Sequence, residues 1–243
     1  MALRDDMQVV VFMGGLGTRL GVAYRDAPKS MVDVHGKPFF HYPLQVLKRQ
    51  GFRRFVFCVG FKADPIQKYF EDGKKYQIQI RYVHDGEQPV GTGGALKRAL
   101  PLLDENVMAI YGDSYIDFEY TKLIDQYDHL KRSDDIAAVM SVMKNKGRWG
   151  KSNASLKANG RLRYDKGHPS ADMEYIDFGA TVLNKQAVAN RLQDGYCDLA
   201  DTYKELGDQD RLGGFEVKER FYDIGTPESL QEFRNFITGE KKP

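Results

Sequence analysis

The stretch "VFMGGLGTRLG" at residues 11–21 decides the fold class, because an apolar run passes directly into a glycine-rich segment that carries an arginine. The run belongs to "MQVVVFM" (7–13), whose β-branched residues are typical of a strand buried on both faces. Gly14, Gly15 and Gly17 allow close backbone approach and positive φ angles. The stretch is therefore either a glycine-rich turn or a loop that binds phosphate.

Apolar runs and helical patterns alternate from this loop to about residue 144. The runs predict strands over 7–13, 52–61, 78–83, 106–114 and 135–143. The helical patterns cover 38–51, 64–73, 93–103 and 120–133. This alternation predicts an α/β, Rossmann-like fold with a mostly parallel sheet and helices on both of its faces.

The pattern changes after residue 144, where turn and strand signals become denser. The expected elements are a hairpin through Asn159-Gly160, a strand over 173–184, helices near 185–194 and 198–206, and two short strands with a capped helix within 215–239. We expect one domain over residues 1–243, with a first part of about 7–144 and a second of about 145–243.

Composition excludes several classes of protein. Lys and Arg total 36 and Asp and Glu 34, so a net charge of +2 gives no footprint for nucleic acid. Cys58 and Cys197 are too few for a disulfide scaffold, which favours a reducing, cytoplasmic location. No apolar run reaches the length of a membrane span, so no membrane association is expected.

Two cations follow the glycines of the opening stretch. Arg19 presents several donors suited to phosphate, and Lys29 adds a point charge. Two familiar phosphate motifs fail here. The dinucleotide fingerprint needs a small residue where Leu20 stands, and the "GKS" at 150–152 lacks the P-loop glycine, because Asn145 occupies that position.

A second glycine-rich segment, "GEQPVGTGGALKRAL" (86–100), stands before a helical pattern. Gly91, Gly93 and Gly94 would leave a wall without side chains, against which a flat nucleobase could lie while backbone amides read its edge. The alternative is a plain helix start capped by Thr92.

Carboxylates follow two apolar runs. Asp113 in "YGDSYIDF" and Asp223 in "FYDIGTPESLQEF" stand where Mg²⁺, which prefers one or two carboxylates plus phosphate oxygens, could bind. The alternative for Asp113 is a strand-end cap. A capped helix start, with Thr226 as N-cap and Pro227 at the first position, explains residues 225–228 but not Asp223.

These segments, in this order, resemble the sugar-1-phosphate nucleotidyltransferase family over roughly residues 7–237. The quoted motifs are "GGLGTRL", "PKSMVDVHGKPFFHY", "EQPVGTGGAL", "YGDS", "IDFGATVLN" and "YDIGTPESL". Their spacing looks most like the D-glycero-D-manno-heptose 1-phosphate guanylyltransferase branch. The first two motifs are also similar to glucose-1-phosphate cytidylyltransferases.

The resemblance implies a GT-A-like nucleotidyltransferase fold, an NTP and a sugar 1-phosphate as substrates, and Mg²⁺ as cofactor. It implies a nucleotide-binding first part and a sugar-phosphate-binding second part. The implied catalytic residues are Arg19, Lys29 and Asp113, and the implied metal ligands are Asp113 and Asp223. The implied nucleotide-binding residues are Gly14, Gly15, Gly17, Thr18, Arg19, Glu87, Gln88, Gly91, Thr92, Gly93 and Gly94. The implied sugar-phosphate-binding residues are Trp149, Lys166, Asp177 and Gly179.

Other functions stay open at this point. GTP with a heptose 1-phosphate is favoured, and cytidylyl or uridylyl transfer to another phosphorylated acceptor is the alternative. A nucleotide-sugar-dependent glycosyltransferase is disfavoured because "DSYID" is not a DxD motif, and the retained charged residues disfavour a non-catalytic nucleotide sensor. Lys166 could instead be a solvated hairpin lysine, and Trp149 a core residue. The final helix, with Phe233 and Phe236, could pack internally or in a homodimer.

Overall fold

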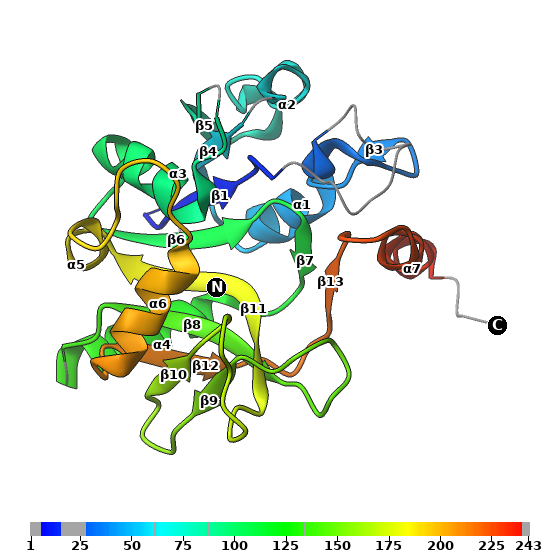
Figure 1. Cartoon of the computed structure of the whole chain (residues 1–243). Coiled ribbons are helices and arrows are strands. Elements are labelled where there is room, and N and C mark those ends of the chain that lie inside the picture. Colours follow the sequence, from blue (N-terminus) through cyan, green and yellow to red (C-terminus); the bar gives the residue numbers. More distant parts are fainter. Residues whose placement is uncertain (1–5, 16–27, 61, 87, 134, 240–243) are drawn as a thin grey trace.

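The computed structural model describes residues 6–15, 28–60, 62–86, 88–133 and 135–239 (Figure 1). Four residues predicted to bind nucleotide, Gly17, Thr18, Arg19 and Glu87, lie outside the described residues.

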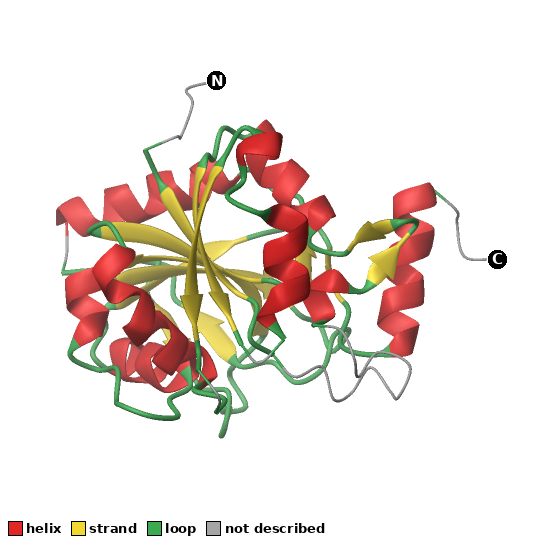
Figure 2. Ribbon diagram, turned by 90° about the horizontal axis from the view of Figure 1, so that it is seen from above, coloured by secondary structure: helices red, strands yellow, loops and turns green. Residues whose placement is uncertain are grey.

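A mixed sheet runs through the centre of the molecule, and nine of its strands lie within the described residues (Figures 1 and 2). Across the sheet the order is β10 (Leu162–Tyr164), β9 (Ala154–Leu156), β11 (Tyr175–Asn184), β6 (Asn106–Tyr111), β1 (Gln8–Phe12), β4 (Arg54–Val59) and β5 (Gln79–His84). Strand β8 (Ala138–Lys144) pairs with β11 and with β12 (Leu212–Glu216). Strands β6, β1, β4 and β5 are parallel, which confirms the predicted α/β class, whereas β11 runs antiparallel to β6 and β8.

Helices cover both faces of this sheet (Figure 2). The helices of the described residues are α1 (His41–Arg49), α2 (Ala63–Phe70), α3 (Gly91–Ala99), α4 (Tyr120–Ser133), α5 (Lys185–Ala189), α6 (Leu199–Asp208) and α7 (Pro227–Thr238). Of these, α7 stands apart from the central sheet at the side of the molecule (Figure 2). The short 3-10 turns within the described residues are η3 (Lys29–Met31), η4 (Lys74–Tyr76) and η5 (Leu100–Leu102). The expected helix over 38–51 begins only at His41, because Lys37–Pro38 forms β3 in a small hairpin with β2 (Asp33–Val34).

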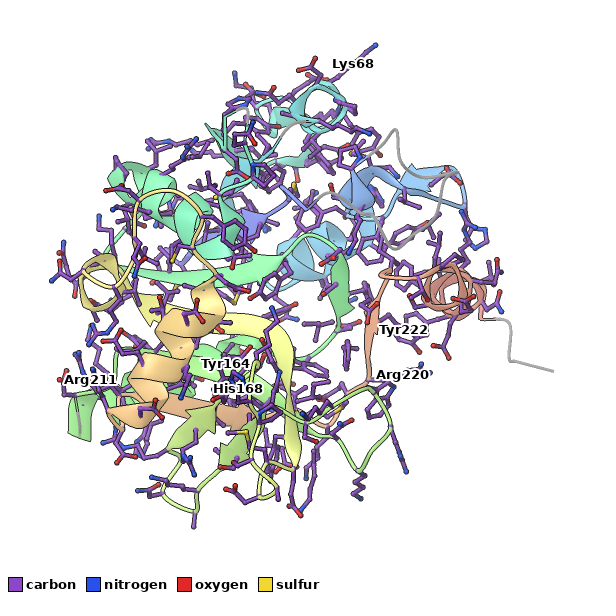
Figure 3. The ribbon with its side chains drawn as sticks, viewed as in Figure 1. Lys68, Tyr164, His168, Arg211, Arg220 and Tyr222 are labelled. Carbon is purple, nitrogen blue, oxygen red and sulfur yellow. The ribbon has the colours of Figure 1, made fainter. Side chains whose placement is uncertain are left out.

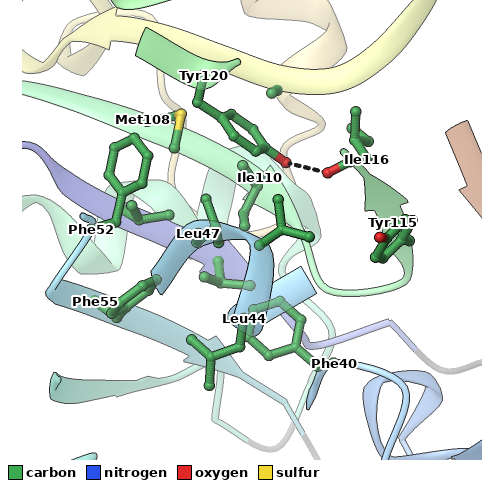
Figure 4. Close-up of a cluster of buried hydrophobic side chains, with 14 of the residues drawn as sticks. Phe40, Leu44, Leu47, Phe52, Phe55, Met108, Ile110, Tyr115, Ile116 and Tyr120 are labelled. Carbon is green, nitrogen blue, oxygen red and sulfur yellow. Dashed lines mark hydrogen bonds between the residues drawn. The ribbon is translucent and has the colours of Figure 1, made fainter. Parts of the chain in front are cut away.

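The apolar residues of β1 explain why two cores form. Val9 and Val11 point into one cluster, whereas Val10 and Phe12 point into the other, because successive side chains of a strand face opposite sides. The first cluster packs under α1, α2, α4 and α7, and Figure 4 shows part of it, including the hydrogen bond from the Tyr120 hydroxyl to the Ile116 carbonyl at 3.2 Å. The second packs under α3, α5 and α6.

A second, two-stranded sheet joins distant parts of the chain. Strand β7 (Ser114–Ile116) pairs antiparallel with β13 (Phe221–Asp223), so Asp223 stands opposite Ser114. Figure 3 shows Arg220 and Tyr222 at this strand, beside α7. The predicted strand over 106–114 therefore ends early, at Tyr111, and a separate short strand follows Asp113.

The predicted local signals near the chain end are confirmed. The Thr226 hydroxyl accepts a hydrogen bond from the Ser229 amide at 3.2 Å, and Pro227 opens α7. Strands from before and after residue 144 share the central sheet. The division into a nucleotide-binding part and a sugar-phosphate-binding part stays a prediction.

Candidate active site

A cavity of about 500 Å³ opens at the carboxyl ends of the parallel strands. Ligands of open α/β sheets bind at this edge. Seven of the predicted residues line it: Gly14, Gly15, Lys29, Gly91, Thr92, Asp113 and Lys166. The other described residues of the lining, which the sequence did not single out, are Phe12, Met13, Ser30, Cys58, Asp85, Pro89, Val90, Ala95, Tyr111, Gly112 and Tyr196. The described residues predicted for the site that are not among its lining are Gln88, Gly93, Gly94, Trp149, Asp177, Gly179 and Asp223.

A close ion pair stands in the cavity wall. The Lys29 ammonium lies 2.7 Å from the Asp113 carboxylate, and the Lys29 side chain is only 13% exposed. Lys29 comes from η3, and Asp113 follows β6 across the cavity. The pair holds the ammonium at a fixed place, where it can neutralise a phosphate without first reorganising.

Gly14 and Gly15 were predicted for one role, but the structure gives them different surroundings. A Cβ atom on Gly14 would lie 2.2 Å from an oxygen of Asp85, whereas a Cβ on Gly15 would meet no atom of the described residues within 4 Å. A larger residue at position 14 would therefore force the Asp85 carboxylate to shift. Among the described residues, Gly15 has open space beside the cavity.

This contrast gives a matched pair of variants. Gly14→Ala should lower the free energy of unfolding by about 1–3 kcal/mol, because the added methyl group overpacks a buried contact. Gly15→Ala should change it by less than about 0.5 kcal/mol, as open-space substitutions usually do. Denaturant unfolding of both variants measures the difference, and equal effects would show that the contact between Gly14 and Asp85 is not tight.

The backbone amides of two glycines at the start of α3 are occupied by a contact within the protein. The amides of Gly93 and Gly94 both donate to the Cys197 carbonyl, at 2.8 and 3.2 Å. Gly91 has a φ of +71°, and a Cβ there would lie 2.4 Å from the same carbonyl. The Gly93 and Gly94 amides thus dock α3 against the segment before α6. Gly91 lines the cavity, and a contact of this segment with a nucleobase stays a prediction.

The alternative interpretation of Thr92 as an N-cap is wrong. Helix α3 follows Val90 without any side-chain cap. The Thr92 hydroxyl instead donates to the Asp198 carboxylate at 3.1 Å and accepts from the Leu199 amide at 2.9 Å. Thr92 thus fixes the start of α6 beside the cavity.

Lys166 reaches the same place from the segment after β10. Its ammonium lies 3.1 Å from the Asp198 carboxylate, and its side chain is 61% exposed. Burial raises the pKa of Asp198, but the Ala200 amide and Lys166 outweigh it and hold the pKa below its usual value. Lys29 and Lys166 therefore place two cations around one cavity.

Asp177 and Gly179 form a bulge in β11. The Asp177 carboxylate accepts from the Gly179 amide at 2.9 Å, at a bulge where Gly179 has a φ of +84°. Burial raises the pKa of Asp177, although the Gly179 amide, Lys166 and Tyr164 oppose the shift. A sugar contact by these residues stays a prediction.

Trp149 is half-buried and packs against Phe221 of β13, with ring centroids 6.1 Å apart. Its amide donates to the Asn145 side chain at 2.9 Å. These contacts fit the core interpretation of the tryptophan, and they place it beside the strand that carries Asp223.

Two carboxylates lie on neighbouring backbone segments. The Ile224 amide donates to the Asp113 carbonyl at 3.2 Å, so Asp113 and Asp223 follow each other across the small sheet. One oxygen of Asp223 accepts from the Gly225 amide at 2.8 Å, and among described residues no donor reaches its other oxygen. Within the described part of the chain there is no group of three or more potential metal ligands. The pair nevertheless fits Mg²⁺, which takes one or two carboxylates plus phosphate oxygens.

Sequence reasoning missed three polar residues of the lining. Asp85 follows β5 and is 6% exposed, Ser30 is 2% exposed, and Tyr196 is 71% exposed. Among the described residues, no group bonds to the Ser30 hydroxyl or to Oδ1 of Asp85. A single acid after a strand, a serine after a lysine and a loop tyrosine carry no distinctive spacing.

Burial raises the pKa of Asp85 from 3.8 to about 6, although the charges of Arg98 and His84 oppose the shift. Between these values the folded protein holds a proton that the unfolded chain has lost. Stability contributed by this group is therefore complete below about pH 4 and is lost as the pH rises through 6.

Asp85→Asn should remove the loss of stability at higher pH, since an amide does not titrate. The variant should gain about 2–3 kcal/mol of stability relative to the wild type between pH 4 and pH 7. Urea unfolding at several pH values measures it, with exposed Asp201→Asn as control. If the free energy of unfolding depends on pH in the same way in the wild type and in Asp85→Asn, a raised pKa of Asp85 is contradicted.

Comparison with known proteins shows to which family the chain belongs. The model of the family described as "Nucleotidyl transferase" matches residues 8–240, and the chain belongs to that family. Nucleotidyl transfer is thus the class of reaction that this fold and cavity serve. In the described part of the chain, no helix has the length and apolar character needed to cross a bilayer.

Individual members of known function and structure are also similar to this chain. The D-glycero-alpha-D-manno-heptose 1-phosphate guanylyltransferase of Campylobacter jejuni is 37% identical over 117 residues, covering 48% of this chain and 52% of that protein. The enzyme of the same name from Aneurinibacillus thermoaerophilus is 29% identical over 231 residues, covering 93% and 96%. The crystal structure of HddC from Yersinia pseudotuberculosis complexed with GMP-PN is similar with a TM-score of 0.75 and 25% identity, over 95% of this chain and 99% of that one.

Proposed function

We propose that this protein transfers the guanylyl group of GTP to D-glycero-α-D-manno-heptose 1-phosphate, releasing pyrophosphate. The observation that carries the proposal is the cavity in which Lys29, paired with Asp113, and Lys166 stand at one strand edge. The names of the two enzymes similar to this chain, and the GMP-PN complex of HddC, favour guanine and a heptose phosphate.

The reaction needs positioning and charge neutralisation more than a base. A phosphate oxygen of the sugar attacks the α-phosphorus of GTP, and the bond from that phosphorus to the bridging oxygen of pyrophosphate breaks. The attacking phosphate is already ionised, so no proton has to be removed first. Two anions must meet, and Lys29 and Lys166 lower the repulsion between them.

Asp113 and Asp223 are the residues that would hold Mg²⁺. The ion, when bound, would neutralise charge on the phosphate oxygens. Lys29 fixes the orientation of the Asp113 carboxylate, and the Gly225 amide fixes that of Asp223. Binding of the triphosphate by Gly17, Thr18 and Arg19, a cytoplasmic location and a homodimer stay predictions from the sequence.

Nucleotide binding is tested by thermal unfolding with Mg²⁺ and GTP, CTP, UTP, dTTP or ATP. GTP should raise the melting temperature by about 5–10 °C at a hundredfold excess over its Kd, because it binds only the native state. The other nucleotides should shift it much less. A larger shift with CTP or UTP would favour the alternative transferase, and no shift with any would contradict nucleotide binding by the free enzyme.

A further inference from the structure

Asp85 is a buried carboxyl group in the cavity wall that the mechanism above does not use. It follows β5, is 6% exposed, and its amide donates to the Val59 carbonyl at 2.8 Å. Its side chain crosses the end of β4 and reaches Gly14, where a Cβ atom would displace it from this position. The carboxyl group is therefore held in place by three strand ends.

No described residue satisfies this group. Oδ1 is buried and accepts no hydrogen bond from a described residue. Arg98, the nearest opposing charge on α3, donates instead to the His84 carbonyl at 3.2 Å. A buried carboxylate without partners is costly, and proteins retain such groups where a ligand completes their bonding.

The surroundings of Asp85 differ from those of the charged end of the cavity. Cys58, Pro89 and Val90 supply apolar walls near it, whereas Lys29 and Asp113 carry the charges at the end of β6. Asp85 follows β5, three strands from β6 in the sheet, and its side chain reaches back across β4 to Gly14 at the end of β1. Asp85 and these apolar walls line the same cavity of about 500 Å³ as Lys29 and Asp113, so a nucleotide bound there can place its phosphates on the charged residues and its base against the apolar walls and Asp85.

We propose that Asp85 is the residue that selects guanine, accepting hydrogen bonds from N1–H and the N2 amino group through its two carboxylate oxygens. The inference rests on the proposed function and names the residue that reads the base. Guanine presents two adjacent donors on this edge. Adenine and cytosine present a donor beside an acceptor, and uracil and thymine present one donor between two carbonyl groups.

Guanine is preferred to the other bases because a wrong base leaves polar groups without hydrogen-bond partners. A base with an acceptor facing the carboxylate leaves a buried charge unsatisfied and places two lone pairs against each other. Sites built to hydrogen-bond a substrate reject analogues that lack the donor by factors of about 10⁴–10⁵. Removing only the N2 amino group, as in ITP, should cost a factor of about 10–100.

Exchange of one oxygen for an amide tests the inference directly. In Asp85→Asn the amide oxygen still accepts from N1–H, but the NH₂ group opposes the amino group of guanine. Xanthine carries a carbonyl group at C2, to which that NH₂ can donate. The variant should therefore prefer XTP to GTP in kcat/KM, whereas the wild type should prefer GTP to ITP about 10–100-fold and to XTP more strongly.

Exposed Asp64→Asn on α2 is the matched control and should keep the wild-type preferences. Retained preference of Asp85→Asn for GTP over XTP would overturn the inference. If the variant does not fold, the wild-type ratio of GTP to ITP decides, and a ratio near one overturns it. If the wild-type protein uses another NTP and not GTP, the proposed function is contradicted. Failure of the proposed function can therefore be told apart from failure of the inference about Asp85.

Discussion

Asp113→Asn should lower kcat for pyrophosphate release at least about a thousandfold, which corresponds to about 4 kcal/mol of lost transition-state stabilisation. The carboxylate is needed for its charge, as a metal ligand and as the partner of Lys29 at 2.7 Å. Asparagine keeps an oxygen that accepts from Lys29, so folding should change little. Steady-state kinetics with Mg²⁺ and thermal unfolding measure the two effects separately.

Asp117→Asn is the matched control for this variant. Asp117 lies four residues further along, and its carboxylate pairs with Arg49 at 2.6 Å on a largely exposed surface. Its loss should leave kcat within about twofold, since exposed ion pairs contribute little. Comparable rates for Asp113→Asn and Asp117→Asn would remove Asp113 from the mechanism.

Lys29→Gln should lower kcat/KM for GTP by about 10²–10³, the effect typical of removing one preorganised group that stabilises developing charge. The Lys29 side chain is 13% exposed and its ammonium is fixed by Asp113, so it acts without reorganisation. If Lys29 acts chiefly on the transition state, kcat falls with kcat/KM, whereas a rise in KM alone would indicate uniform binding of the nucleotide.

Exposed Lys37→Gln, on β3, provides the comparison for net charge. It removes the same charge a few residues from Lys29 but outside the cavity lining. Loss of activity in both variants would point to a general charge effect. Loss in Lys29→Gln alone supports a local role.

The central strands could be predicted because their residues are apolar on both faces. Such runs, separated by helical patterns, have few alternatives to a buried parallel strand, as β1 and β6 confirm. The hairpin through Asn159-Gly160 also formed as predicted, with Gly160 at a φ of +80°. These signals are local, so one sequence suffices to find them.

The pairing of β7 with β13 could not be predicted in the same way. Each strand has three residues, and the partners stand more than 100 positions apart in the chain. The sequence suggested that Asp113 and Asp223 share a metal, but only this pairing shows that they follow neighbouring backbone segments. Long-range contacts of short strands leave no periodic pattern.

Asp85 and the glycines of α3 show why site roles were harder to predict than elements. Glycines before a helix suggest an open wall, but here the Cys197 carbonyl occupies the amides of Gly93 and Gly94. Asp85 looks like an ordinary polar residue at a strand end. Its burial depends on Gly14, which lies far away in the sequence.

The most direct test of the proposed function is one turnover experiment with the wild-type protein. Pyrophosphate release is measured with Mg²⁺ and each of GTP, CTP, UTP, dTTP and ATP. The acceptor is either D-glycero-α-D-manno-heptose 1-phosphate or glucose 1-phosphate, and the nucleotide product is identified by its mass in a mass spectrometer. We predict rapid release only with GTP and the heptose phosphate, with GDP-heptose as product. Faster turnover of CTP or UTP with glucose 1-phosphate would contradict the proposed substrates, and no turnover of any pair would contradict transfer to these two sugar phosphates.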